Sequence, residues 1–293
     1  MPFSQMREII KQERRQTDDN LYISDKFGLA FGIEPFREFM VTGNPILIED
    51  TRIGVFSGGV LDATINLVDY HITSPTALYI GRGSIVQVNS MDDGMTINGL
   101  IMNDEFLDMA VHGNMPPSMC GNELHCLIPV DEKQRDAIVR MLRLMTDMAR
   151  DGCGDKVSAA MAETIILYYD RLFADSQNDI KAGKSREREL FEKFISLVRT
   201  DCRRHRDISH YADLLCVSPR YLGTMVAKAS GLTAKEWIDR GVITAAKVLL
   251  RHGREPVAGI ADRLGFASDS FFCKFFKMHT GQTPTEYRNA GGR

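Results

Sequence analysis

The chain lacks the sequence features that mark several classes of protein. It contains no run of about 18 apolar residues, the length that a helix needs to cross a bilayer. Its opening segment, Met1 to Glu8, has no apolar stretch of the kind found in secretory signals. The six cysteines form no C-x-x-C pair, so disulfides and structural zinc are not expected and the thiols should be free and reduced. These absences favour a cytoplasmic protein without a membrane span.

Clustered metal ligands and catalytic motifs are also missing. His71, His112 and His125 are isolated from one another in the sequence, and no H-x-H pair occurs. Each is therefore interpreted as a surface or core residue, and no metal or other cofactor is expected. No Ser-His-Asp or Cys-His arrangement and no glycine-rich phosphate loop stands in a suitable context. The sequence thus gives no support for an enzyme.

Charge is distributed unevenly along the chain. From Arg186 to the end there are 19 basic and 12 acidic residues, a net charge of +7. Because the whole chain carries −3, the first 185 residues carry −10. A basic C-terminal part beside an acidic N-terminal part indicates that only the former meets a polyanion.

Short apolar segments separated by turn residues fill the region from about Phe36 to Val88. The segments expected as strands are residues 45–49, 64–68, 77–80 and 84–88, with 96–102 as a further candidate. Strands of this length and spacing are typical of an all-β sandwich or barrel. Residues 1–20 are polar and predict a tail or a frayed helix, and the glycine-containing segment 81–87 is interpreted as a hairpin turn.

Helical periodicity begins near Asp131. Apolar residues from Ile138 to Met148 recur at three-to-four spacing and predict an amphipathic helix that stops near Gly152. A second helix is expected over residues 156–174, so that the two form a hairpin. This hairpin can pack on the β-domain or form a dimer interface. The polar segment 175–187 has no apolar period and is the predicted linker.

Two stretches near the C-terminus are diverged copies of each other. The segment Ala212–Leu215 returns as Ala261–Leu264 at an offset of 49, and Gly231–Trp237 returns as Gly281–Tyr287 at an offset of 50. One residue has therefore been inserted between the two matching stretches of the second copy, and Ala267 is the candidate. Such self-similarity is the sequence signature of a repeated structural element.

Each copy is predicted to form a helix, a short turn and a second helix, over residues 208–229 and 256–279. A duplicated helix-turn-helix is typical of proteins that read DNA in the major groove. The second helix of each unit should bury one apolar face and present the other to DNA. The predicted DNA-binding residues are Arg220, Gly223, Thr224 and Lys228 in the first unit and Ser268, Ser270, Cys273, Lys274 and Lys277 in the second. Arg220 can pair bidentately with a guanine, and a phosphate contact or a solvated side chain is the alternative.

A capping box follows each helix-turn-helix unit. Thr233 and Thr283 occupy the N-cap position, and Glu236 and Glu286 stand three residues later. The first box predicts a connecting helix of about 18 residues that ends at Gly253 and measures about 27 Å. Such a helix could hold the two recognition helices one DNA turn apart, about 34 Å.

The C-terminal residues resemble the signature of AraC-type transcription regulators. The matching positions are Gly265, Phe266, Phe272, Phe276, Lys277, Gly281, Thr283, Pro284, Glu286, Tyr287 and Arg288. The resemblance is strong over about residues 190–290 and looser in the first copy and in the connecting helix, where Arg240 matches. It implies a DNA-binding domain over residues 188–290.

Within this resemblance, four residues fall at positions that often contact bases in the family. They are Arg220 and Thr224 in the first unit and Ser270 and Lys274 in the second. Arg240 is a further DNA-binding candidate. Gly223 stands where the family commonly carries a longer polar residue.

The N-terminal part resembles, more weakly, the cupin-like β-barrel sensing domain of such regulators, followed by a helical dimerisation hairpin. The resemblance favours the dimer role of the hairpin. The predicted fold is α+β, with a β-barrel over residues 1–130, the hairpin over 131–174, the linker over 175–187 and an all-α domain of two helix-turn-helix units.

These features together predict a sequence-specific transcription regulator, and an activator is favoured. The expected partners are double-stranded DNA, RNA polymerase, a second copy of the chain and a small-molecule effector in the mouth of the barrel. One alternative is a constitutive regulator whose barrel serves only as a dimerisation scaffold. The other is a cupin-type enzyme with a DNA-binding appendage, which the missing metal ligands disfavour.

Overall fold

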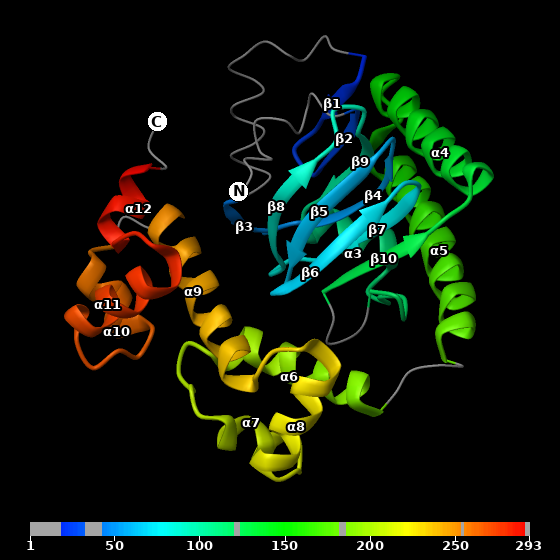
Figure 1. The fold of residues 1–293 in the computed structure, drawn as a ribbon. Coiled ribbons are helices and arrows are strands. Elements are labelled where there is room, and N and C mark those ends of the chain that lie inside the picture. Colours follow the sequence, from blue (N-terminus) through cyan, green and yellow to red (C-terminus); the bar gives the residue numbers. More distant parts are fainter. Residues whose placement is uncertain (1–18, 33–42, 120–123, 182–185, 253–254, 291–293) are drawn as a thin grey trace. The chain divides into compact units, whose positions relative to one another are not determined.

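The computed structural model describes residues 19–32, 43–119, 124–181, 186–252 and 255–290. The chain divides into an N-terminal domain, Met1–Ala182, and a C-terminal domain, Gly183–Arg293 (Figure 1). The first combines two sheets with helices, and the described residues of the second form helices only. This confirms the predicted α+β fold with an all-α C-terminal part, and the boundary falls inside the segment predicted as a linker.

The strands of the N-terminal domain form two antiparallel sheets. In sheet order, the six-stranded sheet contains β1 (Leu21–Ile23), β2 (Phe27–Phe31), β9 (Thr96–Met102), β4 (Thr51–Ser57), β7 (Thr76–Ile80) and β10 (His125–Pro129). The four-stranded sheet contains β3 (Pro45–Leu47), β8 (Ile85–Met91), β5 (Val60–Ile65) and β6 (Val68–Thr73). Across the described residues, these strands form a cupin-like sandwich of two sheets rather than one closed barrel.

Side chains of the six-stranded sheet alternate between two apolar cores, because successive residues of a strand point to opposite faces. On β4, Ile53 and Val55 belong to the core shared with the helices, whereas Phe56 belongs to the core between the two sheets. The helices that pack against the first core are α3 (Asp104–Val111), α4 (Glu132–Arg150) and α5 (Gly154–Lys181). The six-stranded sheet is therefore covered on both faces.

Four of the five predicted strands coincide with β3, β7, β8 and β9, and one is wrong. Residues 64–68 are the end of β5, a two-residue turn and the first residue of β6. Asn66 and Leu67 form the turn with φ of 49° and 79°, as the tight hairpins that match strand twist require. Leu67 is buried, so an apolar turn residue gave this hairpin the pattern of a strand. The expectations for residues 1–18 and for Phe36 lie outside the described residues.

The predicted helical hairpin is present, and its second helix is longer than expected. Asp131 caps α4 and forms a full capping box with Gln134. Helix α5 continues to Lys181, through the first part of the segment predicted as a linker. Residues 175–181 contain no glycine or proline, so the polar composition of this segment does not end the helix.

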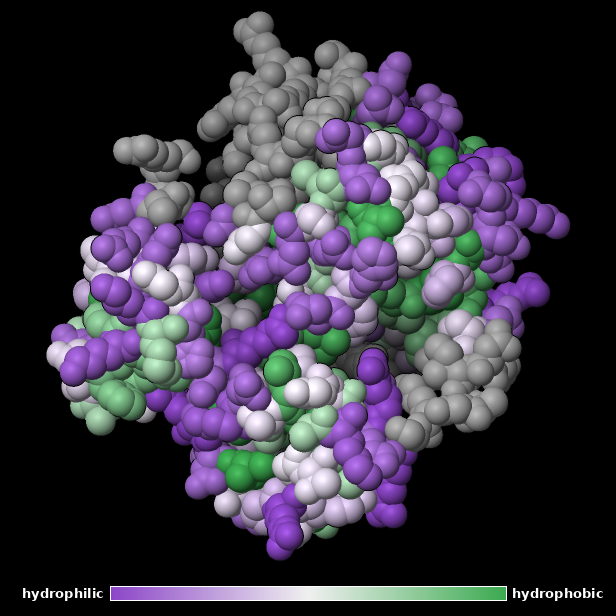
Figure 2. Space-filling model, in the orientation of Figure 1, coloured by the Kyte–Doolittle hydropathy of each residue, from purple (hydrophilic) through white to green (hydrophobic). Residues whose placement is uncertain are grey.

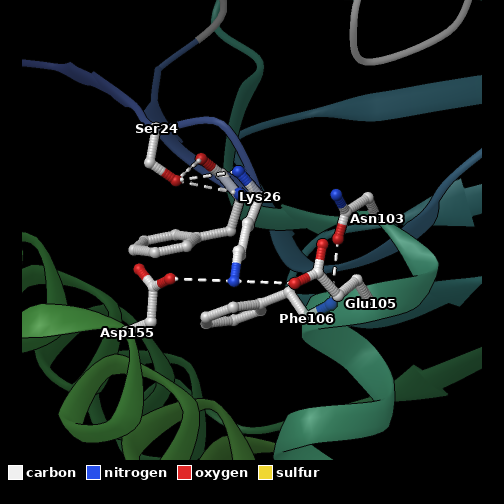
Figure 3. Close-up of polar contacts among 7 residues, drawn as sticks. Ser24, Lys26, Asn103, Glu105, Phe106 and Asp155 are labelled. Atoms are coloured by element: carbon white, nitrogen blue, oxygen red, sulfur yellow. Dashed lines mark hydrogen bonds and ion pairs between the residues drawn. The ribbon is translucent and has the colours of Figure 1, made fainter.

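The turn between β1 and β2 is fastened to two helices (Figure 3). Lys26 Nζ lies 2.8 Å from Glu105 of α3 and 3.1 Å from Asp155 of α5. Hydrogen bonds to these two carboxylates raise the pKa of Lys26, and the bond to Glu105 has the larger effect. The N–H of Asn103 donates to the carbonyl of Lys26, and the Asn103 side chain caps α3 by accepting from Phe106 N. The edge of the sheet, α3 and α5 are thus held together at one point.

The C-terminal domain is built on one central helix. Its elements are α6 (Arg186–Asp201), α7 (Ile208–Leu214), α8 (Pro219–Ser230), α9 (Ala234–His252), α10 (Val257–Arg263), α11 (Asp269–Thr280) and α12 (Pro284–Ala290). Helix α9 contacts α6, α8, α10 and α12. Gly241 of α9 permits the approach of α6, because a Cβ there would lie 2.9 Å from Val198 Cγ1 and 3.1 Å from Cys202 Sγ.

A buried hydrogen bond joins α5 to the six-stranded sheet. The hydroxyl of Tyr169 donates to the carbonyl oxygen of Gly54 on β4 at 2.5 Å, and the Tyr169 side chain is almost completely buried. Burial raises the pKa of this hydroxyl, so it stays protonated and a donor.

We predict that Tyr169→Phe lowers the free energy of unfolding by about 1–2 kcal/mol, because it removes a buried donor and keeps the ring. Urea unfolding of the full chain measures the effect. Tyr168→Phe is the matched control, since this neighbouring hydroxyl makes no hydrogen bond to another described residue. Equal stability of the two variants would contradict the assignment.

Candidate DNA interface

The two helix-turn-helix units share one backbone design. Cys216 and Gly265 take left-handed φ values of 55° and 68° at matching turn positions, and their N–H groups donate to the carbonyl three residues earlier at 3.1 and 2.8 Å. The hydroxyls of Ser218 and Ser268 then accept from the amide three residues later and cap α8 and α11. The turn residues match at an offset of 49 and the caps at 50. This places the additional residue at Ala267, as the sequence indicated.

Helix α8 buries one face and exposes the predicted DNA-binding face. Leu222, Met225 and Val226 are buried. The outward residues are Arg220, Thr224 and Lys228, which are exposed, and Gly223, which is half-buried. Within the described residues, no carboxylate lies within ion-pair distance of Arg220 or Lys228. Both cations are therefore available to a polyanion.

Helix α11 repeats this arrangement with different chemistry. Phe272 and Phe276 are its buried residues, and Phe275 is half-buried against Phe266. The exposed outward residues are Ser270, Lys274 and Lys277. Ser268 serves as the N-cap, and Cys273 is half-buried at the edge of this face, where burial raises the pKa of its thiol.

The structure places the predicted residues of the two faces at equivalent positions. Arg220 and Ser270 each stand two residues after the serine cap, and Thr224 and Lys274 stand one helical turn later. In a helix-turn-helix the first turns of this helix approach the base edges. The two faces would therefore present their side chains to DNA in the same order. The first of these residues is Arg220 in one face and Ser270 in the other.

An exposed apolar edge on α11 was not predicted. Phe271 is 56% exposed and Met278 is 73% exposed, and Figure 2 shows a pale green patch over the region of α10 and α11. Phe271 follows Ser270 in the first turn, where an apolar ring can contact the methyl group of thymine. One sequence signal could have revealed the exposure of Phe271. At helical spacing this residue falls outside the face shared by Phe272 and Phe276, although the run of phenylalanines around it mostly supplies core residues.

A cleft of about 770 Å³ lies beside the first recognition helix. Arg206, Arg220 and Lys235 contribute three cations to its lining. Gly223 also lines it, and the nearest atom to a Cβ at this position would be Ile208 Cδ1 at 3.6 Å, an ordinary contact. The absence of a side chain at Gly223 therefore leaves a hollow in the recognition face, although the packing around this position would permit a side chain.

Arg240 lies on α9 rather than on a recognition helix. Its half-buried guanidinium lies over the ring of Trp237, 5.2 Å from the centroid. Arg240 thus lies on the connecting helix, and its role in DNA binding stays a prediction.

Both predicted capping boxes are present. Thr233 N donates to Glu236 and Thr283 N to Glu286, each at 2.7 Å, and the glutamate amides donate back to the threonine hydroxyls at 3.2 and 3.3 Å. These bonds from the threonines lower the pKa of both glutamates. Helix α9 is continuous over 19 residues, about 28 Å at the usual rise. Its predicted end, Gly253, lies outside the described residues.

One arginine links the first helix-turn-helix unit to the second. The guanidinium of Arg206, just before α7, lies 3.4 Å from the centroid of the Phe266 ring and donates to the carbonyl oxygen of Leu264. A Cβ on Gly265 would lie 3.2 Å from the carbonyl oxygen of Arg203. The segment that enters the first unit thus packs against the turn of the second.

The described residues offer no cluster of three metal-ligating side chains. Their five cysteines are free thiols, and Cys120 lies outside the described residues. The most deeply buried of the five, Cys202, has its pKa raised to about 11 by burial. No helix in the described ranges is both long and apolar enough to cross a membrane.

A family model described as a helix-turn-helix domain matches residues 211–290, which include both turns. Residues 211–290 form an AraC-type helix-turn-helix domain. This confirms the resemblance that the sequence indicated.

Several curated proteins are similar to the chain. The arabinose operon regulatory protein of Salmonella typhimurium is 33% identical over 29% of this chain and 30% of its own length. The regulatory protein PocR of the same organism is 32% identical over 33% of this chain and 31% of its own length. The transcriptional activator RhaS of Escherichia fergusonii is 24% identical over 63% of this chain and 65% of its own length. The chain thus spans about a third of the first two relatives and under two thirds of the third.

Solved structures give broader but looser matches. A crystal structure of ToxT from Vibrio cholerae covers 92% of this chain and 99% of that chain at 16% identity, with a TM-score of 0.41. The DNA-binding domain of AdpA in complex with a target DNA covers 34% of this chain and 90% of that chain at 21% identity, with a TM-score of 0.32.

We predict that Arg206→Ala lowers the affinity for a duplex with sites for both helix-turn-helix units by about tenfold. The affinity for a duplex with only one of these sites should fall much less. The variant loses the ring contact and the hydrogen bond, together about 1–2 kcal/mol, so the second unit is no longer fixed relative to the first. Fluorescence anisotropy with the two duplexes measures both affinities.

Arg206→Lys is the control for charge. It keeps the cation and loses the planar group that stacks on Phe266, so it should resemble Arg206→Ala. Wild-type affinity of both variants for the two-site duplex would show that this contact does not couple the units.

Proposed function

We propose that the chain is a sequence-specific DNA-binding transcription regulator whose two recognition helices read successive major-groove segments on one face of a duplex. The observation that carries this proposal is the repeated outward face of α8 and α11. Each face starts at a serine cap, and the exposed residues Arg220, Thr224, Ser270 and Lys274 occupy matching positions. Hydrogen-bonding and cationic side chains at the start of a helix suit the donors and acceptors of the major groove.

The unequal chemistry of the two faces supports reading of an asymmetric site. Arg220 favours guanine in the segment that faces α8, because its fork matches the O6 and N7 acceptors. In the DNA segment that faces α11, Ser270 and Phe271 favour base pairs that offer a small polar contact and a thymine methyl group. Lys228 and Lys277 stand further along each helix and suit phosphate contacts, which position the protein without reading sequence.

The proposal extends to regulation by the N-terminal domain. RhaS is described as a transcriptional activator, and this favours activation over repression for the present chain. We place RNA polymerase among its partners and the protein in the cytoplasm, where both polymerase and DNA are found. The two-sheet domain acts as the sensor of a small-molecule effector.

The helical hairpin is the proposed dimer interface. Leu144 of α4 and Leu167 of α5 are 55% and 57% exposed, and Val157 is exposed near the start of α5. Exposed leucines on both helices of one hairpin supply apolar side chains that a two-fold interface would bury.

Selection of binding sites from random duplexes, followed by gel-shift titration, tests the DNA-binding proposal. Arg220→Ala should weaken binding to the selected site by about 1–3 kcal/mol, roughly 5- to 150-fold, and relax the preference at one base pair. Lys228→Ala should weaken binding evenly across sequences and reduce the slope of log affinity against log salt by about one.

Lys193→Ala is the control, since Lys193 is exposed on α6 and pairs with Glu189 at 2.7 Å. It should leave the affinity and the salt slope unchanged. If Arg220→Ala and Lys193→Ala bind the selected site alike, the assigned recognition face is incorrect.

For the dimer, we expect Leu144→Glu with Leu167→Glu to convert the chain to a monomer in sedimentation at micromolar concentration, because each change buries a charge in the apolar interface. Leu214→Glu is the control, at a leucine of α7 that is 52% exposed. A wild-type protein that sediments as a monomer would already reject the interface.

A further inference from the structure

The recognition face of α8 contains a hollow at Gly223 with an apolar floor. Gly223 shares the outward face with Arg220 and Thr224, and all three residues line the cleft beside the helix. A Cβ at Gly223 would meet Ile208 Cδ1 at 3.6 Å, so the half-buried side chain of Ile208 lies behind the hollow. The other apolar side chains of the lining are Pro219, Ala234 and Ile238. We call this space the Gly223 hollow.

Thr224 presents a methyl group beside the Gly223 hollow. Its hydroxyl donates to the carbonyl oxygen of Arg220 at 2.9 Å, one turn earlier in the same helix. This bond occupies the single hydrogen that a hydroxyl can donate. Thr224 is exposed and lines the cleft, so its γ-methyl group is the part of the side chain that remains for apolar contact with a base.

The second unit differs at both positions. The serine caps match at an offset of 50, so Cys273 and Lys274 of α11 occupy the positions of Gly223 and Thr224. Cys273 places a half-buried thiol where α8 has no side chain, and Lys274 is exposed. The hollow and the neighbouring methyl group are therefore features of α8 that α11 does not repeat.

A methyl group is the apolar feature that base pairs offer in the major groove. It stands at C5 of thymine, and cytosine methylated at C5 carries the same group. A glycine lets another molecule approach the helix backbone more closely than a residue with a side chain does. A base methyl group can therefore enter the Gly223 hollow and contact Thr224 and Ile208. An unmethylated pyrimidine would leave the hollow unfilled and forfeit these contacts.

The spacing of Arg220 and Thr224 limits where this methyl group lies in the site. The two residues are four apart, about 6 Å along a helix. Successive base pairs are about 3.4 Å apart. A base contacted at Thr224 therefore lies no more than about two base pairs from a base contacted by Arg220.

We propose that the first helix-turn-helix unit reads a guanine and a 5-methylpyrimidine within about two base pairs of each other. Arg220 binds the guanine, and the methyl group of thymine or 5-methylcytosine enters the Gly223 hollow against Thr224. This inference rests on the proposed DNA-binding function and names the chemistry that α8 selects. Methylation of cytosine at C5 strengthens binding at this position rather than blocking it.

Fluorescence anisotropy of the full chain with variants of its selected site tests the inference. The base pair read by Arg220 is the one whose preference Arg220→Ala relaxes, and each thymine within two base pairs of it is replaced in turn by uracil. Wild-type protein should bind one of these uracil duplexes about fourfold more weakly, as expected for loss of one buried methyl group. At that position, 5-methylcytosine should bind about fourfold more tightly than cytosine.

Two substitutions of Thr224 separate its methyl group from its hydroxyl. Thr224→Ser removes the methyl group and keeps the hydroxyl, so the ratio of thymine to uracil affinity should fall below twofold. Thr224→Val keeps a methyl group and loses the hydroxyl, so the fourfold ratio should persist. Thr164→Ser is the matched control and should keep the wild-type ratio. Thr164 is exposed on α5, and its hydroxyl likewise donates to the carbonyl oxygen four residues earlier, at 3.0 Å.

A third variant fills the Gly223 hollow. Gly223→Leu introduces a residue that favours helix, and its Cβ would make only an ordinary contact with Ile208. It should weaken binding to the thymine duplex at least fourfold and remove the difference between thymine and uracil. The substitutions of Thr224 test the same contact if Gly223→Leu impairs folding.

A wild-type ratio close to one at every thymine near the guanine, or a selected site without a thymine there, would overturn the inference. So would a ratio that Thr224→Ser leaves unchanged. An effect of the methyl group in thymine but not in 5-methylcytosine would overturn the extension to methylated cytosine. Failure to select any site would reject the proposed function as well, whereas a selected site without the methyl effect rejects this inference alone.

Discussion

The arrangement of the DNA-binding domain depends on how the second helix-turn-helix unit is fixed relative to the first. Helix α9 sets the distance between the units, and α10 and α12 of the second unit pack against it. Arg206 supplies the further restraint, because its guanidinium lies on Phe266 and bonds the carbonyl of Leu264 in the second turn. This contact is half-buried, so water competes with it less than with a surface ion pair. Two short recognition helices can read one continuous site only if both restraints hold.

Much of the C-terminal domain could be predicted from the sequence because its signals are local. A serine cap, a left-handed turn residue and a Thr-x-x-Glu box each act over four residues, and the repeat displays every one of them twice. The contact of Arg206 with Phe266 could not be predicted in this way, since its partners lie about sixty residues apart and are joined only by the fold. The exposure of Phe271 was not predicted because a run of phenylalanines suggested core, although this position lies outside the face that Phe272 and Phe276 share.

The N-terminal domain was harder to predict because its central sheet is buried on both faces. In β2, Phe27–Phe31, all five residues are buried, so the polar alternation that marks a half-exposed strand is absent. Strand β4 has the same character and was not predicted either. The strands that were found lie mostly beside glycine, proline or asparagine turns. The cavity between the two sheets, which Gly54 and Gly99 line, has no sequence signal at all, since these glycines become partners only through the pairing of β4 with β9.

The bond from Tyr169 to Gly54 gives the two walls of the cavity between the sheets unequal stiffness. Gly54 is held from behind by a buried hydroxyl of α5, and the helices of the domain cover that side of the six-stranded sheet. The four-stranded sheet has no such backing in the described residues, and alternate residues of β6 are exposed. Among the described residues, the helices α3, α4 and α5 thus share a core with the six-stranded sheet, whereas the core between the sheets contains strand and loop residues only. We therefore expect a change in the volume between the sheets to displace the four-stranded sheet more than the six-stranded one.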